Sequence, residues 1–206
     1  MSASDRPGAR VAVVIVVVAI AAVGIWFWRR PAPIAPGILF VGDSVTYMST
    51  KQLDEEMHSD SPEVLARVGF TSSDMLPLVT REVDRRAKDD ELRQVAVLIG
   101  YNDVLKQHAD SPALARVMAL ANRFDCAVWL TLPPIPLREK EVAEWNRRVA
   151  ETAGSYPHVH VVDDWRKAVE AAPLGELITR RDGVHPTPGG AKRLSEIYTD
   201  AVHRVC

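Results

Sequence analysis

Residues 38–46 read Ile-Leu-Phe-Val-Gly-Asp-Ser-Val-Thr. The apolar run predicts a short strand that is buried on both faces of a parallel sheet. The run stops at Gly42, and a helical pattern begins just after Ser44. Ser44 is therefore expected at the carboxyl end of a strand, where open α/β sheets bind ligands. At that position the serine either caps the next helix or acts as a nucleophile among unpaired backbone N–H groups.

The rest of the chain alternates between short β-branched runs and longer helical patterns. Strands are predicted at 38–42, 63–68, 94–99, 127–132 and 159–162. Helices are predicted at 46–58, from a Ser72 or Ser73 cap to 89, and at 111–124, 139–154 and 188–205. This order predicts a three-layer α/β/α sandwich with a five-stranded parallel sheet, in one domain over residues 38–206.

The first thirty residues have a different character. Residues 11–28 carry no charge and would span about 27 Å as a helix, close to the thickness of a bilayer core. Aromatic residues and Arg29-Arg30 end the segment and make a poor signal-peptide cleavage site. We therefore predict an uncleaved membrane anchor at 1–30 and a proline-rich linker at 31–37. Arginines flank the span on both sides, so the expected single-pass, extracytoplasmic arrangement rests on the general pattern of signal anchors.

Composition narrows the classes of partner and cofactor. The net charge is −2, and the chain beyond residue 30 is acidic without a basic stripe, which argues against nucleic-acid binding. No Cys/His cluster has the spacing of a metal site, and His158 and His160 are interpreted as structural or exposed. The residues therefore give no indication of a metal site. Cys126 and Cys206 are compatible with a disulfide or with free thiols.

Glycine and polar residues follow the other predicted strands and precede the last helix. They are Gly69, Gly100-Tyr101-Asn102-Asp103 and Asp182-Gly183-Val184-His185. Each signal is weak alone, because a strand-ending glycine is usually a turn. Together with Ser44 they supply the groups that acyl transfer requires.

The chemistry assigns a role to each group. Ser44 would be the nucleophile, His185 the base, and Asp182 the group that orients the imidazole; the chain order Ser, Asp, His is a known arrangement of the triad. The oxyanion could receive hydrogen bonds from the backbone N–H groups of Ser44 and Gly69 and from the Asn102 amide.

At these residues the chain resembles the SGNH hydrolases, also called GDSL esterases and lipases, over about residues 38–205. The resemblance implies a flavodoxin-like α/β/α sandwich, the same roles for the five site residues, and neither metal nor cofactor. Val45 and Thr46 follow Ser44, so the Gly-x-Ser-x-Gly elbow of the α/β-hydrolases is absent.

Two further motifs resemble those of SGNH domains attached to membrane O-acyltransferases that acetylate cell-surface polysaccharides. They are Val162-Asp163-Asp164-Trp165 and Trp145-Asn146. The first hypothesis is therefore a membrane-anchored serine esterase acting on small O-acyl groups, with acetyl on an extracytoplasmic carbohydrate as one candidate. The alternative is an O-acyltransferase, which would need a membrane partner to supply acyl groups. The third is a non-catalytic glycan-binding scaffold. The two tryptophans are interpreted as packing residues.

Overall fold

A computed structural model describes residues 37–58, 61–108 and 111–206 of the chain. Its five strands form one parallel sheet in the order β2-β1-β3-β4-β5. The strands are β1 (Leu39–Gly42), β2 (Glu63–Ala66), β3 (Gln94–Leu98), β4 (Cys126–Leu130) and β5 (Val159–Val162). The predicted five-stranded parallel sheet is confirmed.

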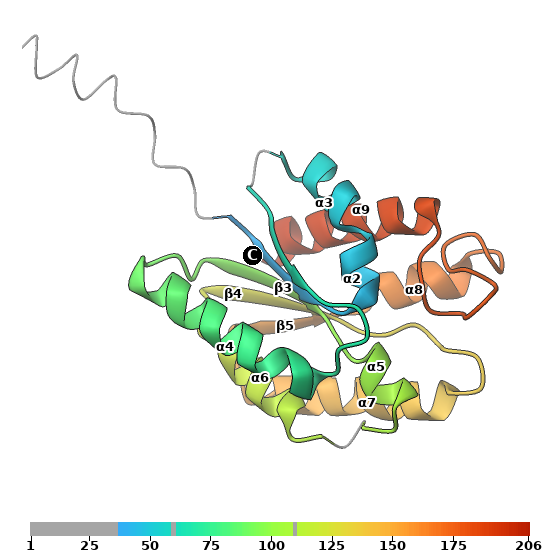
Figure 1. The fold of residues 1–206 in the computed structure, drawn as a ribbon, viewed down its shortest axis with the longest axis horizontal. Helices are drawn as coiled ribbons and strands as arrows, with labels where there is room; N and C mark the ends of the chain where they lie inside the picture. Colours follow the sequence, from blue (N-terminus) through green and yellow to red (C-terminus); the bar gives the residue numbers. More distant parts are fainter. Residues whose placement is uncertain (1–36, 59–60, 109–110) are drawn as a thin grey trace, which may run out of the picture. The chain divides into compact units, whose positions relative to one another are not determined.

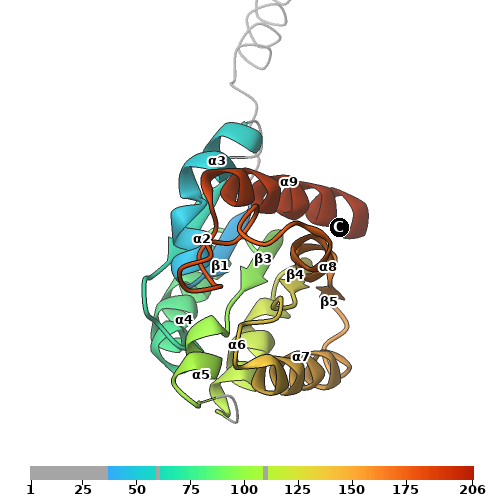
Figure 2. The ribbon, with the colours of Figure 1, turned by 90° about the vertical axis from the view of Figure 1, so that its right-hand side faces the viewer.

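Helices cover both faces of this sheet, which confirms the three predicted layers (Figures 1 and 2). On one face, α4 (Ser72–Lys88), α6 (Ala113–Ala121) and α7 (Glu139–Ala153) pack side by side. On the other face, α9 (Pro188–Val205) packs against α3 (Thr50–Glu56) and α8 (Asp164–Ala171). Two short helices, α2 (Ser44–Met48) and α5 (Tyr101–Leu105), follow directly after β1 and β3.

The strand register brings the carboxyl ends of neighbouring strands into line. Gly42, the last residue of β1, pairs with Ala66 on β2 and with Leu98 on β3. The segments that carry Ser44, Gly69 and Asn102 therefore leave the sheet side by side, at one end. This alignment positions the candidate site.

Several predicted helix boundaries are wrong. The helix predicted at 46–58 is two helices, α2 and α3, because the chain turns at Ser49, whose backbone N–H donates to the Thr46 carbonyl. The cap of α4 is Thr71 rather than Ser72 or Ser73, since Thr71 and Asp74 form a reciprocal capping box. The helix predicted at 111–124 is shorter, and α5 and α8 were not predicted.

Buried tryptophans fill the interior between the layers. Trp129, Trp145 and Trp165 are all fully buried, which confirms the packing role predicted for the last two. The Trp165 indole N–H also donates to the Tyr101 hydroxyl at 3.0 Å. This contact links α8 to α5 and satisfies a polar group that would otherwise be buried without a partner.

A disulfide joins Cys126, at the start of β4, to Cys206, directly after α9, with 5.7 Å between the Cα atoms. The two cysteines are 80 positions apart in sequence. Loop-closure arguments put the stabilisation from a ring of this size at roughly 4.5 kcal/mol. The sequence had left this pairing open.

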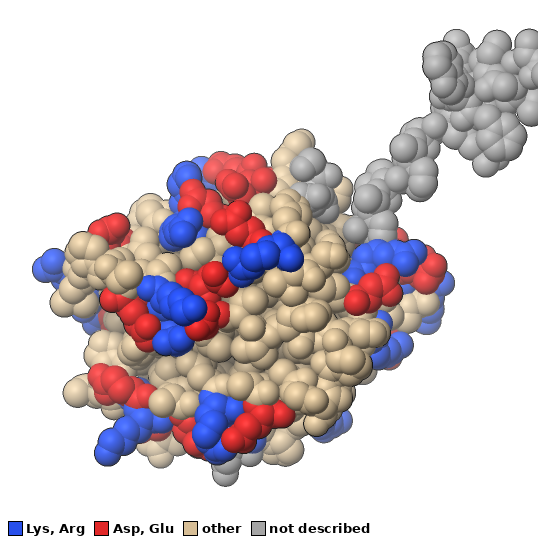
Figure 3. Space-filling view, turned by 180° about the vertical axis from the view of Figure 1, so that it is seen from behind, with Lys and Arg blue, Asp and Glu red and all other residues tan. Residues whose placement is uncertain are grey.

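The predicted anchor at 1–30, with its apolar span at 11–28, and residues 31–36 of the predicted linker lie outside the described residues. Among the helices that are described, none combines the length and the apolar character needed to span a bilayer. On the face seen in Figure 3, basic and acidic side chains are intermixed in small groups. Among the described residues, many charged side chains pair along a helix, as Arg166 does with Asp163 and Glu170.

Candidate active site

Ser44 is the first residue of α2, directly after β1 and Asp43. Asp43, and not Ser44, caps the helix, because an Asp43 carboxylate oxygen accepts from the Val45 N–H at 3.1 Å. The interpretation of Ser44 as the cap is therefore wrong. Its hydroxyl is left for another partner, while its own N–H lies in the first turn, where helices have no internal acceptor.

That partner is His185, which lies 141 positions later in the chain. The His185 Nε2 is 3.0 Å from the Ser44 Oγ. The Nδ1 of the same ring is 2.9 Å from the Asp182 Oδ2. The structure therefore brings the three predicted triad residues into one hydrogen-bonded row. In this row the carboxylate fixes the imidazole tautomer, leaving Nε2 to accept the serine proton.

Asp182 is held by donors from its own loop. Its Oδ1 accepts from the backbone N–H groups of Val184 and His185 and from the Thr179 hydroxyl, at 2.8–3.0 Å. Burial alone would raise the pKa of Asp182, but these bonds and the His185 ring hold that pKa well below its usual range. The carboxylate therefore stays ionised and can stabilise an imidazolium.

The three triad residues differ in exposure. Ser44 is 4% exposed, whereas the His185 and Asp182 side chains are 35% and 38% exposed. Ser44 is therefore buried more deeply than the other two side chains, and solvent can reach the His185–Asp182 pair.

Asn102 and Gly69 lie on either side of the Ser44 strand, after β3 and β2 respectively. The Asn102 Nδ2 is buried and has no hydrogen-bond partner among the described residues. An unpaired buried donor is costly, and at this end of the sheet it is available to a ligand atom. Gly69 has a φ of +78°, and a Cβ there would meet nothing within 4 Å. The left-handed backbone explains the glycine.

Asp103 connects these two segments. Its carboxylate accepts from the Ser72 backbone N–H at 2.8 Å and from the Ser72 hydroxyl at 2.5 Å. Because Asp103 directly follows Asn102, this contact holds the segment after Gly69 against the helix that carries Asn102. Sequence reasoning had considered Ser72 only as a cap. It missed Lys106, which donates to the Gly69 carbonyl at 2.7 Å and whose only sequence signal is its four-residue spacing from Asn102.

Asp43 is a second carboxyl group beneath the site. It is fully buried, and its Oδ2 has no hydrogen-bond partner among the described residues. Burial raises the pKa of Asp43 to about 7, against the opposing effects of the Val45 and Tyr101 backbone N–H groups and of His185, while nearby Asp103 raises it further.

Within the described ranges, no three His, Cys, Asp or Glu side chains are grouped as a metal site would require. His158, one of the histidines interpreted as structural, places its Nδ1 2.9 Å from the Phe124 carbonyl.

No family model matches the chain, and no match to a curated protein is found. Solved structures do share its fold. A GDSL-like lipase from Bacteroides thetaiotaomicron superposes with a TM-score of 0.66 at 17% identity, covering 85% of this chain and 91% of that one. The C-terminal catalytic domain of Streptococcus pneumoniae peptidoglycan O-acetyltransferase A gives 0.61 at 15% identity, with 84% and 93% covered.

A lipase/acylhydrolase from Enterococcus faecalis gives a TM-score of 0.62 at 17% identity, over 82% of this chain and 97% of that chain. These similarities show that the chain has the fold of the SGNH, or GDSL, hydrolases. The resemblance of the sequence blocks is confirmed at the level of the fold.

Proposed function

We propose that this chain is a serine esterase of the SGNH type that hydrolyses small O-acyl esters through an acyl-enzyme on Ser44. One observation carries the proposal: the Ser44 hydroxyl, both nitrogens of the His185 ring and the Asp182 carboxylate form a continuous hydrogen-bonded row. A scaffold that only binds a glycan would not need this row, so the third hypothesis is disfavoured.

The row supports an ordinary acyl-transfer sequence. As the Ser44 Oγ attacks the ester carbonyl carbon, the His185 Nε2 takes the serine proton. The oxyanion that forms accepts from the N–H groups of Ser44 and Gly69 and from the Asn102 Nδ2. The tetrahedral intermediate collapses, and His185 returns the proton to the leaving alcohol. Water, deprotonated by His185, then releases the acid and regenerates the Ser44 hydroxyl.

We assign an acyl group of few carbons, such as acetyl, to the substrate. The support for this assignment is the fold that the chain shares with the catalytic domain of a peptidoglycan O-acetyltransferase, whose name specifies an acetyl group.

We further propose an acylated carbohydrate outside the cytoplasm as the substrate. Three features support this assignment: the Cys126–Cys206 disulfide, which is typical of oxidising compartments; the predicted anchor at 11–28; and the fold shared with a peptidoglycan O-acetyltransferase domain. The test is to add protease to intact cells. If the domain is protected from cleavage there, this location is contradicted.

A second candidate is O-acyl transfer to a polysaccharide, which the same structural neighbour favours. The acyl-enzyme would be identical, but an acceptor hydroxyl would replace water in the second half of the reaction. A separate membrane protein would have to supply the acyl groups. Product analysis in the presence of an acceptor oligosaccharide separates the two: acetylated oligosaccharide supports transfer, whereas acetate alone supports hydrolysis.

The test of catalysis uses p-nitrophenyl acetate and the full-length chain. We expect Ser44→Ala to lower kcat by at least about 10³-fold, since it removes the nucleophile. Ser73→Ala is the matched control, because Ser73 is exposed and its hydroxyl contacts only the Ser111 hydroxyl among the contacts described. Equal rates for the wild-type chain and Ser44→Ala would refute the serine mechanism.

A further inference from the structure

Lys106 bridges the two residues that flank Ser44 as oxyanion donors. Its backbone N–H donates to the Asn102 carbonyl at 3.0 Å, and its Nζ donates to the Gly69 carbonyl at 2.7 Å. Lys106 directly follows α5, one helical turn after Asn102, so the two lie on the same side of that turn. One residue therefore ties the segment after β2 to the helix after β3.

Gly69 has little else to fix its orientation. It has no side chain to pack, its φ is +78°, and it faces open space. The neighbouring residues are held on both sides: the Arg67 N–H donates to the Gly42 carbonyl, and Ser72 donates to Asp103. At Gly69 itself, the hydrogen bond that the structure describes comes from Lys106.

We infer that Lys106 is a positioning residue, which sets the relative placement of the Gly69 N–H and the Asn102 Nδ2 around the oxyanion. The inference rests on the proposed esterase function. Oxyanion donors act at 2.7–3.1 Å, and a misplacement of about 1 Å can cost 10²-fold in rate. Lys106 acts through Gly69 and Asn102 and does not touch the ester.

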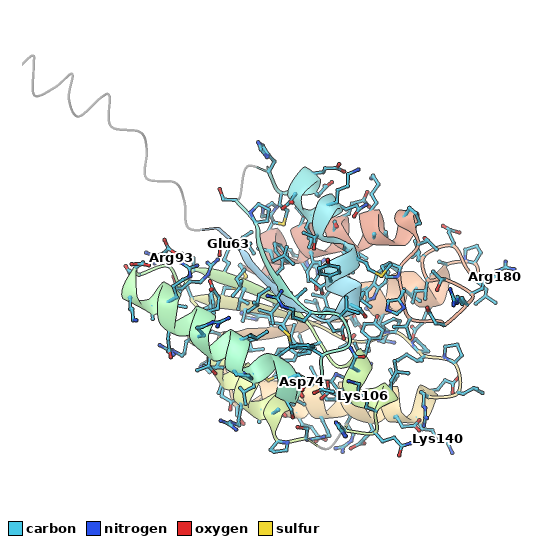
Figure 4. The ribbon with its side chains drawn as sticks, viewed as in Figure 1. Glu63, Asp74, Arg93, Lys106, Lys140 and Arg180 are labelled. Atoms are coloured by element: carbon cyan, nitrogen blue, oxygen red, sulfur yellow. A yellow bond between two sulfur atoms is a disulfide. The ribbon has the colours of Figure 1, made fainter. Side chains whose placement is uncertain are left out.

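The hydrogen bond from Lys106 to Gly69 should affect the geometry of the site more than the stability of the fold. The Lys106 side chain is exposed, and a charged hydrogen bond at the surface contributes little to stability. The buried Asp103–Ser72 pair already joins the same two segments. Figure 4 shows Lys106 next to Asp74 at the start of α4. Asp74 has its pKa lowered mainly by the Thr71 N–H and hydroxyl, with a smaller contribution from Lys106.

The experiment compares three variants of the full-length chain on p-nitrophenyl acetate. Lys106→Met keeps a long side chain but removes the donor, whereas Lys106→Arg keeps a donor. Lys140→Met is the control, because Lys140 is also exposed but lies at the start of α7, apart from Lys106 (Figure 4). We expect Lys106→Met to lower kcat about tenfold, with KM and the thermal midpoint unchanged. Lys106→Arg should recover to within about threefold of the wild-type kcat, and Lys140→Met should match the wild type.

The outcomes distinguish failure of this inference from failure of the proposed esterase function on which it rests. An unchanged kcat in Lys106→Met, with Ser44→Ala inactive, would overturn the positioning role and leave the esterase intact. A fall in the thermal midpoint that parallels the fall in kcat, with no recovery in Lys106→Arg, would also overturn it. If Ser44→Ala is as active as the wild type, the proposed function itself fails.

Discussion

The Trp145 indole occupies the space that a side chain at position 100 would need. A Cβ built on Gly100 lies 2.3 Å from the Trp145 ring, and Gly100 has a φ of +129°. Gly100 ends the segment after β3 and directly precedes Tyr101 and Asn102. The glycine at position 100 therefore serves two purposes. It lets α7 pack against the sheet, and it allows the backbone turn that places Asn102.

We expect Gly100→Ala to lower the free energy of unfolding by about 2 kcal/mol or more, because the backbone is strained for alanine and the indole must move. Gly189→Ala is the control, since a Cβ there meets only the Thr187 hydroxyl at 3.8 Å. Denaturant unfolding of both variants measures the difference. Equal stability of the two would contradict the close-packing argument.

Asp182→Asn should lower kcat about 10³- to 10⁴-fold with little change in KM, because the amide no longer fixes the imidazole tautomer. The lowered pKa of Asp182 adds a dependence on pH. A carboxyl whose folded pKa is depressed contributes stability above its unfolded value of 3.8, and this is lost as the pH falls through the folded value. The gap in stability between the wild type and Asp182→Asn should therefore close in acid. A gap that stays constant down to low pH would contradict the assignment.

Asp43 should give the opposite dependence on pH. Its folded pKa of about 7 lies above the unfolded value of 3.8, so its stabilising contribution is complete below pH 3.8 and is lost as the pH rises through about 7. Asp43→Asn lacks this loss and can still accept from the Val45 N–H. Its stability relative to the wild type should rise across this interval, by at most about 1.4 kcal/mol per pH unit. Urea unfolding at several pH values measures this difference, and a flat difference would refute the shift.

Replacing both cysteines, Cys126→Ala with Cys206→Ala, should lower the free energy of unfolding by about 2–5 kcal/mol, because the ring no longer restricts the unfolded chain. At 25 °C the folded variant should retain its kcat, since neither cysteine is among the triad or the oxyanion donors. A reductant should lower the thermal midpoint of the wild type and leave that of the variant unchanged. A wild-type midpoint that survives reduction, as verified by thiol titration, would contradict the prediction.

The strands and long helices could be predicted because their signals are local. Most of the strands are compact apolar runs that end at a polar or turn-forming residue, although β2 begins with Glu63 and β5 contains His160. In contrast, α5 and α8 span only five and eight residues, too short for a helical period to stand out. The split at Ser49 depends on one turn that no periodicity reveals.

For the site, as for the fold, local sequence signals could be predicted, whereas contacts between distant residues could not be predicted from local patterns. Ser44 and His185 are 141 positions apart, so their contact could be expected only from the resemblance and the chemistry of the triad. The Cys126–Cys206 pairing could not be predicted from the sequence, because it depends on where α9 ends relative to β4. Lys106 was missed because an exposed lysine near a helix end is ordinary on any protein surface.

The disulfide encloses part of the triad in a covalent ring. The chain from Cys126 to Cys206 contains Asp182 and His185, whereas Ser44 lies outside it. Arg180 and Arg181 are exposed, within the ring and just before the acid–base pair (Figure 4 labels Arg180). A trypsin-like protease that cuts there produces a nicked, two-chain protein whose fragments remain joined by the Cys126–Cys206 disulfide. In reducing surroundings, no covalent bond holds the fragment that bears Asp182 and His185, and only the packing of α9 keeps it in place.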